Sequence, residues 1–196
     1  MIAIINYGAG NLASVQKAFA CFRSDCVVTS DPREVAHADK IILPGVGHFA
    51  ATQSLFTNGM APVIREAIQR GTPMLGICLG LQWLFQGSSE AEGVPGLELF
   101  SGMCSRFPAQ VKSPHVGWNQ LQIKKSTRLL QNIPSGSYFY FTHSYRAPIT
   151  EATTAACHYG DPFTAAVESA KVFGVQFHPE KSGAAGLKLL ENFCAL

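Results

Sequence analysis

One cysteine of this chain lies in a pattern that presents nucleophiles. Cys78 is the central residue of Gly-Ile-Cys-Leu-Gly at residues 76–80, between an apolar run and a segment with helical spacing. The pattern G-x-nucleophile-x-G is typical of a sharp strand-to-helix turn that lifts its central side chain above a parallel sheet. The N-terminus of the following helix carries partial positive charge, which favours a thiolate. We therefore expect Cys78 to attack an electrophile; a buried cysteine between two packing glycines is the alternative.

A thiol nucleophile needs a base, which is usually a histidine oriented by a third group. His178 directly follows the apolar run 172–177, so it lies at the carboxyl end of a predicted strand, on the edge where Cys78 emerges. Glu180 follows two residues later and can accept a hydrogen bond from the imidazole. These positions predict a triad of Cys78, His178 and Glu180. His143, which also ends an apolar run, is the alternative base, and either histidine could simply be a hydrogen-bonded residue at a strand end.

Attack by a thiolate on a carbonyl group creates an oxyanion, which two backbone N–H groups can stabilise. With this kind of turn, one donor belongs to the residue after the nucleophile, here Leu79, and the other to a nearby strand-to-helix loop. The loop 44–47, Pro-Gly-Val-Gly, follows the apolar run 41–43. Its glycines would let the Val46 peptide turn an N–H towards a substrate. We predict an oxyanion hole built from Val46, Gly47 and Leu79; a plain turn is the alternative for the loop.

A second glycine pattern suggests a different kind of site. Residues 8–13 follow the first apolar run and match G-x-G-x-x-[GA], and Asp31 lies near the position of a ribose-binding acid. The match is weak by itself, because short turns between strands and helices favour glycines. We prefer a tight turn that exposes Asn6, Tyr7 and Asn11 on a functional surface, since a nucleotide-binding module has no need of a reactive cysteine.

The elements that would position these groups alternate along the first half of the chain. Continuous apolar runs are typical of strands in a parallel sheet that helices cover on both faces. We therefore predict an α/β fold with a mostly parallel, doubly wound central sheet. The predicted strands are 2–6, 26–29, 40–43 and 74–77, and the predicted helices are 12–22, 61–69 and 79–85.

The second half changes character, because Pro, Gly and Asp turn signals separate short β-rich runs. We interpret these runs as antiparallel strands and hairpins added to the sheet. The expected antiparallel strands are 103–107, 118–123, 138–142, 153–158 and 163–168, followed by an interior strand at 172–177 and a closing helix at 184–193.

The composition excludes several classes of function. The 196 residues are 47% hydrophobic and 14% charged, which fits one compact domain spanning residues 1–196. A net charge of +2 without long charge runs gives no sign of nucleic-acid binding. The six cysteines show no metal-ligand spacing and are too sparse for a disulfide scaffold, so we expect no metal and a reducing cytoplasm. We also expect neither a signal peptide nor a membrane-spanning segment.

Together these patterns resemble the class I (triad) glutamine amidotransferases, which have a flavodoxin-like α/β fold. Within that family the chain looks like the glutaminase subunits of imidazole glycerol phosphate synthase, of histidine biosynthesis. The cysteine turn and His-Pro-Glu at 178–180 are shared by the class, whereas Gly-Trp-Asn at 117–119 and Lys-Ser at 181–182 point to this subunit. The resemblance covers nearly the whole chain, in the blocks 6–12, 44–47, 76–82, 114–119, 143–145 and 174–182.

The resemblance implies a complete reaction without a cofactor. Cys78 would attack the side-chain amide of glutamine, giving a γ-glutamyl thioester and ammonia, and water would then release glutamate. His178 would act as base and then as acid, with Glu180 orienting it. The residues implied to hold glutamine are Gly47, Gln82 and the backbone around His143, Ser144 and Tyr145, which makes His143 a binding residue rather than the base.

The resemblance also implies a partner. Ammonia would pass to a separate (β/α)8-barrel cyclase subunit that closes the imidazole ring, so the chain would be half of a heterodimer. Asn11, Tyr140 and Lys181 match positions at this subunit contact. The segment 88–101 departs most from the family pattern and receives no role. Two alternatives stay open: the glutaminase subunit of another synthase, and a related α/β cysteine hydrolase that uses only water as acceptor.

Overall fold

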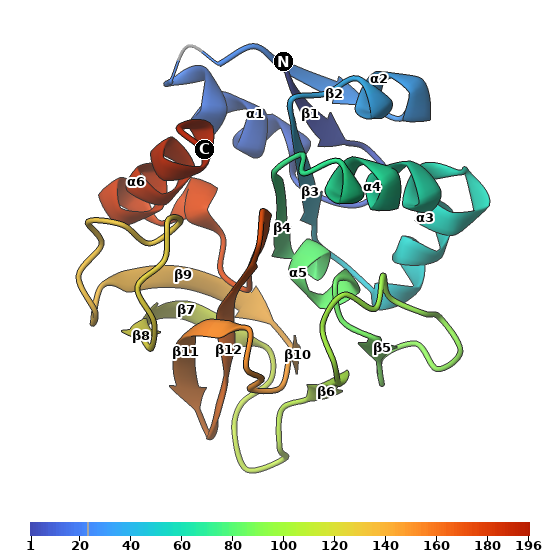
Figure 1. The fold of residues 1–196 in the computed structure, drawn as a ribbon. Coiled ribbons are helices and arrows are strands. Elements are labelled where there is room, and N and C mark those ends of the chain that lie inside the picture. The colour runs from blue at the N-terminus through green and yellow to red at the C-terminus, as the bar shows by residue number, and fades with distance from the viewer. Residues whose placement is uncertain (23) are drawn as a thin grey trace.

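The computed structural model describes residues 1–22 and 24–196, and an eight-stranded sheet runs through its centre (Figure 1). From one edge to the other the strands are β2 (Cys26–Thr29), β1 (Ile2–Ile5), β3 (Lys40–Gly45), β4 (Met74–Cys78), β13 (Val172–Val175), β12 (Asp161–Ser169), β11 (Thr153–Tyr159) and β8 (Gln122–Ile123). The first five run parallel, and the last three continue the sheet antiparallel. Every residue of β1, β4 and β13 is buried, as expected for strands covered on both faces.

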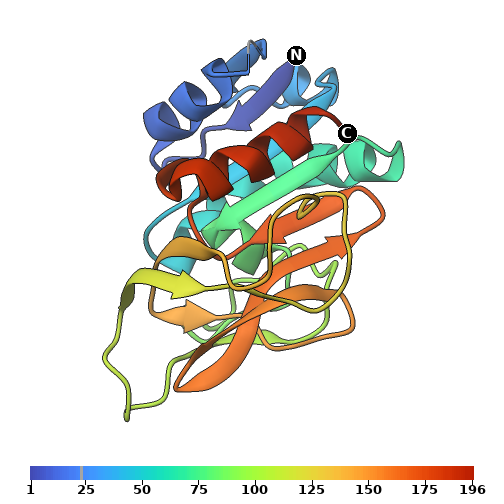
Figure 2. The ribbon, with the colours of Figure 1, turned by 90° about the vertical axis from the view of Figure 1, so that its left-hand side faces the viewer.

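Helices cover both faces of this sheet, as Figures 1 and 2 show. Side chains of β1 alternate between the two cores, with Ile2 and Ile4 in one and Ala3 and Ile5 in the other. The first core includes residues of α1 (Leu12–Ala20) and α6 (Gly183–Cys194). The second includes residues of α2 (Pro32–Ala36), η1 (Phe49–Thr52), α3 (Gln53–Thr57), α4 (Met60–Gln69) and α5 (Leu79–Trp83). The predicted α/β fold with a mostly parallel sheet between helices is confirmed.

Two smaller sheets lie beside the central one. An antiparallel ribbon pairs β7 (His115–Gln120) with β9 (Tyr138–His143), and a second sheet joins β10 (Tyr145–Arg146), β6 (Met103–Arg106) and β5 (Gly87–Ser88). The prediction that the strands near 103–107, 118–123 and 138–142 extend the central sheet is therefore wrong for β6, β7 and β9. It is correct for β8, β11 and β12.

The reason for this separate ribbon is the alternating burial of β9, which buries Phe139, Phe141 and His143 and leaves the side chains between them more open. Phe139 and Phe141 pack against Phe177, with ring centroids 4.2 and 5.7 Å apart. A strand with one buried and one open face packs as a layer on a core instead of lying between helices.

Two predicted strands also differ in extent. The expected strand 118–123 is split at the buried Leu121, whose N–H donates to the Ser137 carbonyl at 2.9 Å, outside the ladder of β7. The expected strand 172–177 ends at Val175, the last residue that pairs with β4 before β4 turns into α5. After Leu121 the chain pairs with a different strand, β11. After Val175 it leaves β4, although the Gln176 N–H still donates to the Ala165 carbonyl of β12 at 2.9 Å.

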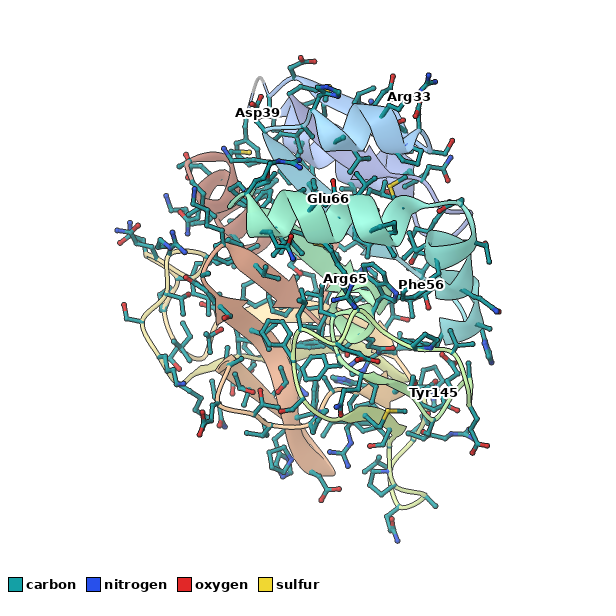
Figure 3. The ribbon with its side chains drawn as sticks, turned by 45° about the vertical axis from the view of Figure 1, so that its right-hand side comes forward. Arg33, Asp39, Phe56, Arg65, Glu66 and Tyr145 are labelled. Carbon is teal, nitrogen blue, oxygen red and sulfur yellow. The ribbon has the colours of Figure 1, made fainter. Side chains whose placement is uncertain are left out.

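The helix α5 ends at Trp83, because another segment takes over its carbonyl groups. The N–H of Leu97 donates to the Trp83 carbonyl at 2.6 Å, and neighbouring N–H groups of residues 96–100 donate to the carbonyls that follow. Arg65 on α4 also donates to the Leu97 carbonyl, at 2.7 Å (Figure 3). No role was predicted for the segment 88–101. In the structure it supplies the hydrogen-bond donors for the carbonyl groups at the C-terminal end of α5.

Residues 1–22 and 24–196 contain no helix long and apolar enough to cross a lipid bilayer. Within the same ranges, no three His, Cys, Asp or Glu side chains are grouped to hold a metal ion. All six cysteines are free.

Candidate active site

Cys78 is the last residue of β4 and directly precedes α5. Its backbone has φ 55° and ψ −104°, a conformation that is strained for a residue with a side chain. The flanking glycines are required by space: a Cβ on Gly76 would lie 2.6 Å from the Gly80 carbonyl oxygen, and one on Gly80 would lie 1.9 Å from that of Leu43. The chain therefore forms the predicted sharp turn, with the cysteine side chain at the carboxyl edge of the sheet.

This close approach predicts that Gly80→Ala cannot fold normally. The added methyl group would overlap the Leu43 backbone, so we expect the free energy of unfolding to fall by about 3 kcal/mol or more. Gly93→Ala is the matched control, because its φ of +82° is strained but no atom lies within 4 Å of the added Cβ; about 1 kcal/mol is expected. Urea unfolding measures both. Equal losses would contradict the described contact between α5 and β3.

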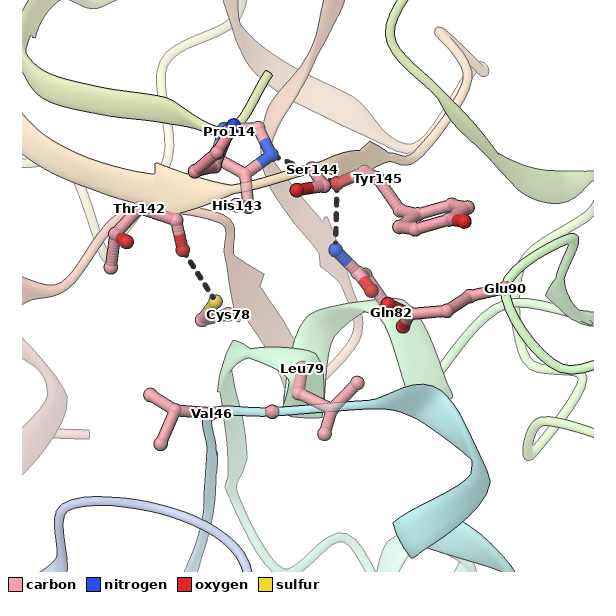
Figure 4. A pocket seen from close by; sticks show the side chains of 11 residues that line it. Val46, Cys78, Leu79, Gln82, Glu90, Pro114, Thr142, His143, Ser144 and Tyr145 are labelled. Atoms are coloured by element: carbon pink, nitrogen blue, oxygen red, sulfur yellow. Dashed lines mark hydrogen bonds between the residues drawn. The ribbon is translucent and has the colours of Figure 1, made fainter.

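The Cys78 sulfur lies where β4, β9 and the chain after β13 meet. Its thiol donates to the Thr142 carbonyl at 3.8 Å (Figure 4). The sulfur also accepts from Nε2 of Gln176 at 3.7 Å. Only 5% of the residue is exposed. The hydrogen of the thiol is thus directed at a backbone carbonyl, which it would have to leave before the sulfur could attack as a thiolate.

His178 and Glu180 form a second, tightly held pair. Nδ1 of His178 lies 2.9 Å from Oε1 of Glu180, and only 2% of each side chain is exposed. The backbone of His178 is fixed as well, because its N–H donates to the Tyr140 carbonyl at 2.9 Å and its carbonyl accepts from the Ser182 hydroxyl at 2.6 Å. The carboxylate therefore orients the ring so that Nε2 is left free for proton transfer.

Electrostatics connect this pair to Cys78. Burial lowers the pKa of His178, but the thiolate of Cys78 and the carboxylate of Glu180 outweigh burial and raise that pKa to about 10. A side-chain hydrogen bond with Cys78 contributes to this rise, so the sulfur lies within reach of the His178 ring, although the thiol also donates to the Thr142 carbonyl. Transfer of the proton to His178 therefore requires the thiol hydrogen to leave Thr142, after which a thiolate and an imidazolium stabilise each other.

A cavity of about 230 Å³ opens beside the sulfur of Cys78 (Figure 4). It brings together the loop after β3 with residues of α5, β9 and β10, which are far apart in the sequence. The predicted oxyanion-hole and substrate-binding residues all line it. The full set of lining residues is Val46, Gly47, Cys78, Leu79, Gln82, Glu90, Pro114, Thr142, His143, Ser144 and Tyr145.

The loop 44–47 begins in a fixed position and ends in an open one. Gly45 pairs with Cys78 across β3 and β4, and a Cβ there would lie 2.2 Å from the Tyr7 hydroxyl. Gly47 has φ +112° and no atom within 4 Å of a built Cβ, and Val46 is 36% exposed. The loop is thus held beside Cys78 at one end, with space for its last peptide to turn.

The sequence interpretation missed several residues of this site, among them Glu90 and Gln176. Glu90, from the segment 88–101, is the one carboxylate among the described cavity-lining residues, and its Oε2 accepts the Phe49 N–H at 2.8 Å. No local pattern marks it. Gln176, which contacts the Cys78 sulfur, is fully buried, and its signal was present: it is a polar residue inside the apolar run 172–177.

The glycine pattern at 8–13 forms a tight turn in this structure. Gly8 has φ +89° and Gly10 has φ +117°, which are backbone conformations that favour glycine. Asp31 caps α2 and pairs with Arg33 at 2.8 Å, so its carboxylate is already engaged. The expectation that Tyr7 is exposed is wrong: it is 7% exposed, because its ring packs into the core on the α2–α5 side.

The predicted partner-contact residues are exposed or half-buried and lie near one another. Lys181 places its Nζ 5.9 Å from the centre of the Tyr140 ring, and Trp118 lies edge-on to the same ring at 6.1 Å. Asn11 caps α1, which contacts η2 (Pro179–Lys181). On the same ribbon, Val116, Trp118 and Tyr138 are each more than half exposed, at 57, 55 and 55%.

Comparison with known proteins identifies the family. The family model for glutamine amidotransferase class-I matches residues 3–196. Imidazole glycerol phosphate synthase subunit HisH of Moorella thermoacetica is 48% identical over 195 residues, which cover 98% of this chain and 93% of that protein. The protein of the same name from Thermococcus kodakarensis is 48% identical over 199 residues, 98% of each chain.

The fold agrees with this family. A crystal structure described as a glutamine amidotransferase superposes with a TM-score of 0.76, covers 99% of this chain and all of its own, and shares 17% sequence identity. That likeness concerns the fold alone, whereas the family model and the sequence relatives cover nearly the whole chain. The chain therefore belongs to the class-I glutamine amidotransferases and, within them, to the family of the imidazole glycerol phosphate synthase subunit HisH.

Proposed function

We propose that this chain is the glutaminase subunit of an imidazole glycerol phosphate synthase, and that it hydrolyses glutamine to glutamate and ammonia as a single domain in the cytoplasm. The observation that carries the proposal is the position of Cys78. It stands on a strained turn, beside the His178–Glu180 pair, at the wall of a cavity of amino-acid size.

The cavity offers acceptors for the charged end of an amino acid. Both hydrogens of the Gln82 side-chain amide are used within the protein, by the Tyr145 carbonyl at 2.8 Å and by Oε1 of Gln176 at 3.2 Å. Its oxygen is therefore the atom that Gln82 can offer to a ligand. Glu90 adds a carboxylate on the same side. Together they suit the α-ammonium group of glutamine, with its side-chain amide directed at Cys78.

The chemistry follows from these positions. The Cys78 thiol gives its proton to Nε2 of His178, and the thiolate attacks the amide carbon of glutamine. The imidazolium returns that proton to the amide nitrogen, the C–N bond breaks, and ammonia leaves behind a γ-glutamyl thioester. A water molecule then attacks the thioester, giving its proton to His178, and glutamate departs as the thiolate takes back the electron pair of the C–S bond. Glu180 stabilises the imidazolium in both steps.

The oxyanion of each tetrahedral intermediate needs backbone donors. Leu79 begins α5, so its N–H has no partner within the helix and lies next to the nucleophile. The second donor is assigned to Val46 or Gly47, whose peptide has room to turn. Gly47, Gln82 and residues 143–145 complete the binding site.

The ammonia acceptor is proposed to be a (β/α)8-barrel cyclase subunit. The surface around Tyr140 and Lys181 supports a partner here, because exposed Val116, Trp118 and Tyr138 form an apolar area beside the cationic Lys181. This area belongs to the ribbon whose strand β9 accepts the hydrogen bond of the Cys78 thiol at the Thr142 backbone carbonyl. A partner bound at Asn11, Tyr140 and Lys181 would therefore lie next to the elements that hold the active site.

The test is the rate of glutamine hydrolysis by the chain alone and with its barrel partner. We expect slow turnover by the chain alone and an increase of about 100-fold in the rate when the partner carries its nucleotide ligand. An effect of this size is typical of coupling between two separate sites. The partner without ligand is the control. Rapid turnover without any partner, cleavage of peptides, or activation only by another synthase would each contradict the proposal.

A further inference from the structure

A hydrogen-bond chain of three polar side chains, the half-buried Asn119 and the buried His115 and His143, runs from β7 to the substrate cavity. Nδ2 of Asn119 lies 3.2 Å from Nε2 of His115, and Nδ1 of His115 lies 3.1 Å from Nε2 of His143. Nδ1 of His143 in turn lies 2.8 Å from the carbonyl oxygen of Tyr145. His115 is 4% exposed and His143 is 6% exposed, although neither is part of the triad.

The direction of every bond in this chain is fixed. Burial lowers the pKa of His143 to about 3 and that of His115 to about 4, so both rings are neutral and carry one N–H each. The Tyr145 carbonyl can only accept, so His143 holds its hydrogen on Nδ1 and its Nε2 must accept from His115. His115 therefore holds its hydrogen on Nδ1, and its Nε2 accepts from Asn119.

The far end of the chain is fixed in the same way. The second hydrogen of the Asn119 amide goes to the His158 carbonyl at 3.1 Å, and its oxygen accepts the N–H of Gln120 at 2.8 Å. The Asn119 amide thus has one orientation that satisfies its neighbours. A backbone carbonyl at each end and one N–H per ring leave a single arrangement of hydrogens.

At its other end the hydrogen-bond chain reaches Gln82, the residue proposed to face the substrate. The Tyr145 carbonyl accepts from both His143 and Gln82, at 2.8 Å each (Figure 4). Gln82 also donates to Oε1 of Gln176, and Nε2 of Gln176 donates to the Cys78 sulfur. Because Nε2 of Gln82 is held by the Tyr145 carbonyl, the position of that carbonyl decides that Gln82 presents its oxygen to the cavity.

We propose that His115 is a positioning residue for glutamine binding. With Asn119 it donates the hydrogen bond that fixes the His143 ring, and the His143 ring fixes the Tyr145 carbonyl on which the orientation of Gln82 depends. The inference rests on the proposed function, because it assigns these groups to the binding of glutamine. No group of His115 lines the cavity, so its effect must pass through His143.

The competing explanation is that His115 only fills space. Its ring stacks on Tyr159 at 4.1 Å and on Phe141 at 5.0 Å between centroids. Two substitutions separate stacking from donation. His115→Phe keeps an aromatic ring but has no N–H, whereas His115→Asn loses the ring but places its amide N–H where Nδ1–H was. The two explanations therefore predict opposite rankings.

The experiment measures glutamine hydrolysis by the complex with its barrel partner, together with urea unfolding of each variant. We expect His115→Phe to raise KM for glutamine about ten-fold with kcat within about three-fold, and His115→Asn to keep KM near wild type although it is less stable. His37→Asn, at the C-terminal end of α2 and outside both this hydrogen-bond chain and the cavity lining, is the control for loss of a histidine and should change neither value. A larger KM increase in His115→Asn than in His115→Phe would overturn the proposal.

A spectroscopic readout tests the hydrogen-bond chain without activity. In protein with ¹⁵N-labelled histidine, the ring-nitrogen shifts should show hydrogen on Nδ1 of both His115 and His143 in the wild type. In His115→Phe, the Nε2 signal of His143 should shift as its donor is lost. A wild-type His143 with its hydrogen on Nε2 would overturn the inference even in an active enzyme. An inactive wild-type complex with the expected shifts would instead contradict the proposed function.

Discussion

Cys78→Ser is expected to abolish glutamine-dependent synthesis by the assembled synthase and to leave synthesis from added ammonia at the wild-type rate. Serine suits the same turn, so the fold and the partner surface should be kept, but its hydroxyl is a far weaker nucleophile than a thiolate at neutral pH. We expect glutamine hydrolysis to fall by at least about 10⁴-fold. Product formation measured with glutamine and then with an ammonium salt gives both values on one sample.

The control is Cys21→Ser, which changes an exposed cysteine far from the cavity and should leave both activities intact. If Cys78→Ser lost the ammonia-dependent reaction as well, the two reactions would not be divided between the subunits as proposed. If it kept glutamine-dependent synthesis, the nucleophile would have to be another group.

The second large effect is expected at His178. His178→Ala removes the group that takes up and returns the proton, so glutamine hydrolysis should fall by roughly 10³- to 10⁴-fold. Ammonia-dependent synthesis again shows whether the complex has formed. Glu180→Gln should lower the rate of glutamine hydrolysis less than His178→Ala does. The amide oxygen of the substituted side chain can still accept the hydrogen bond from Nδ1 of His178 and keep the ring in place.

Glu180→Gln should also shift the pH profile. Burial lowers the pKa of His178, while the charges of Cys78 and Glu180 raise it. Without the carboxylate the pKa falls, so the imidazolium is lost at a lower pH and the basic limb of kcat/KM moves down. Glu191→Gln, at an exposed position paired with Lys188, is the matched control and should leave the profile unchanged. A Glu180→Gln profile identical to wild type would argue against an electrostatic role for this carboxylate.

Sequence reasoning predicted the turn at Cys78, the proposed nucleophile, and the positions of its proposed partners because each depends on local geometry. Gly76 and Gly80 mark the turn at Cys78, and the structure shows that neither position has room for a methyl group. His178 follows a strand of the parallel sheet, and the carboxyl ends of such strands meet at one edge. The same reasoning brought the loop 44–47 to that edge, where it lines the cavity.

The parts that sequence did not predict depend on how separate layers pack. His115 meets His143 only because β7 pairs with β9 in a ribbon outside the central sheet, and the sequence placed those strands within it. Glu90 reaches the cavity from the segment 88–101, which is held to α5 by backbone hydrogen bonds and so carries no side-chain pattern. Hydrophobic periodicity predicts which residues are buried, but not against which layer they pack.

The backbone angles at Cys78 imply a trade-off between the stability of the fold and the reactivity of the thiol. The conformation at this position suits glycine, so a chain shaped only to resist unfolding would gain from losing its sulfur here. Cysteine at this position lowers the free energy of unfolding, because the backbone conformation disfavours any side chain. The packing of the rest of the core must compensate for that loss of stability.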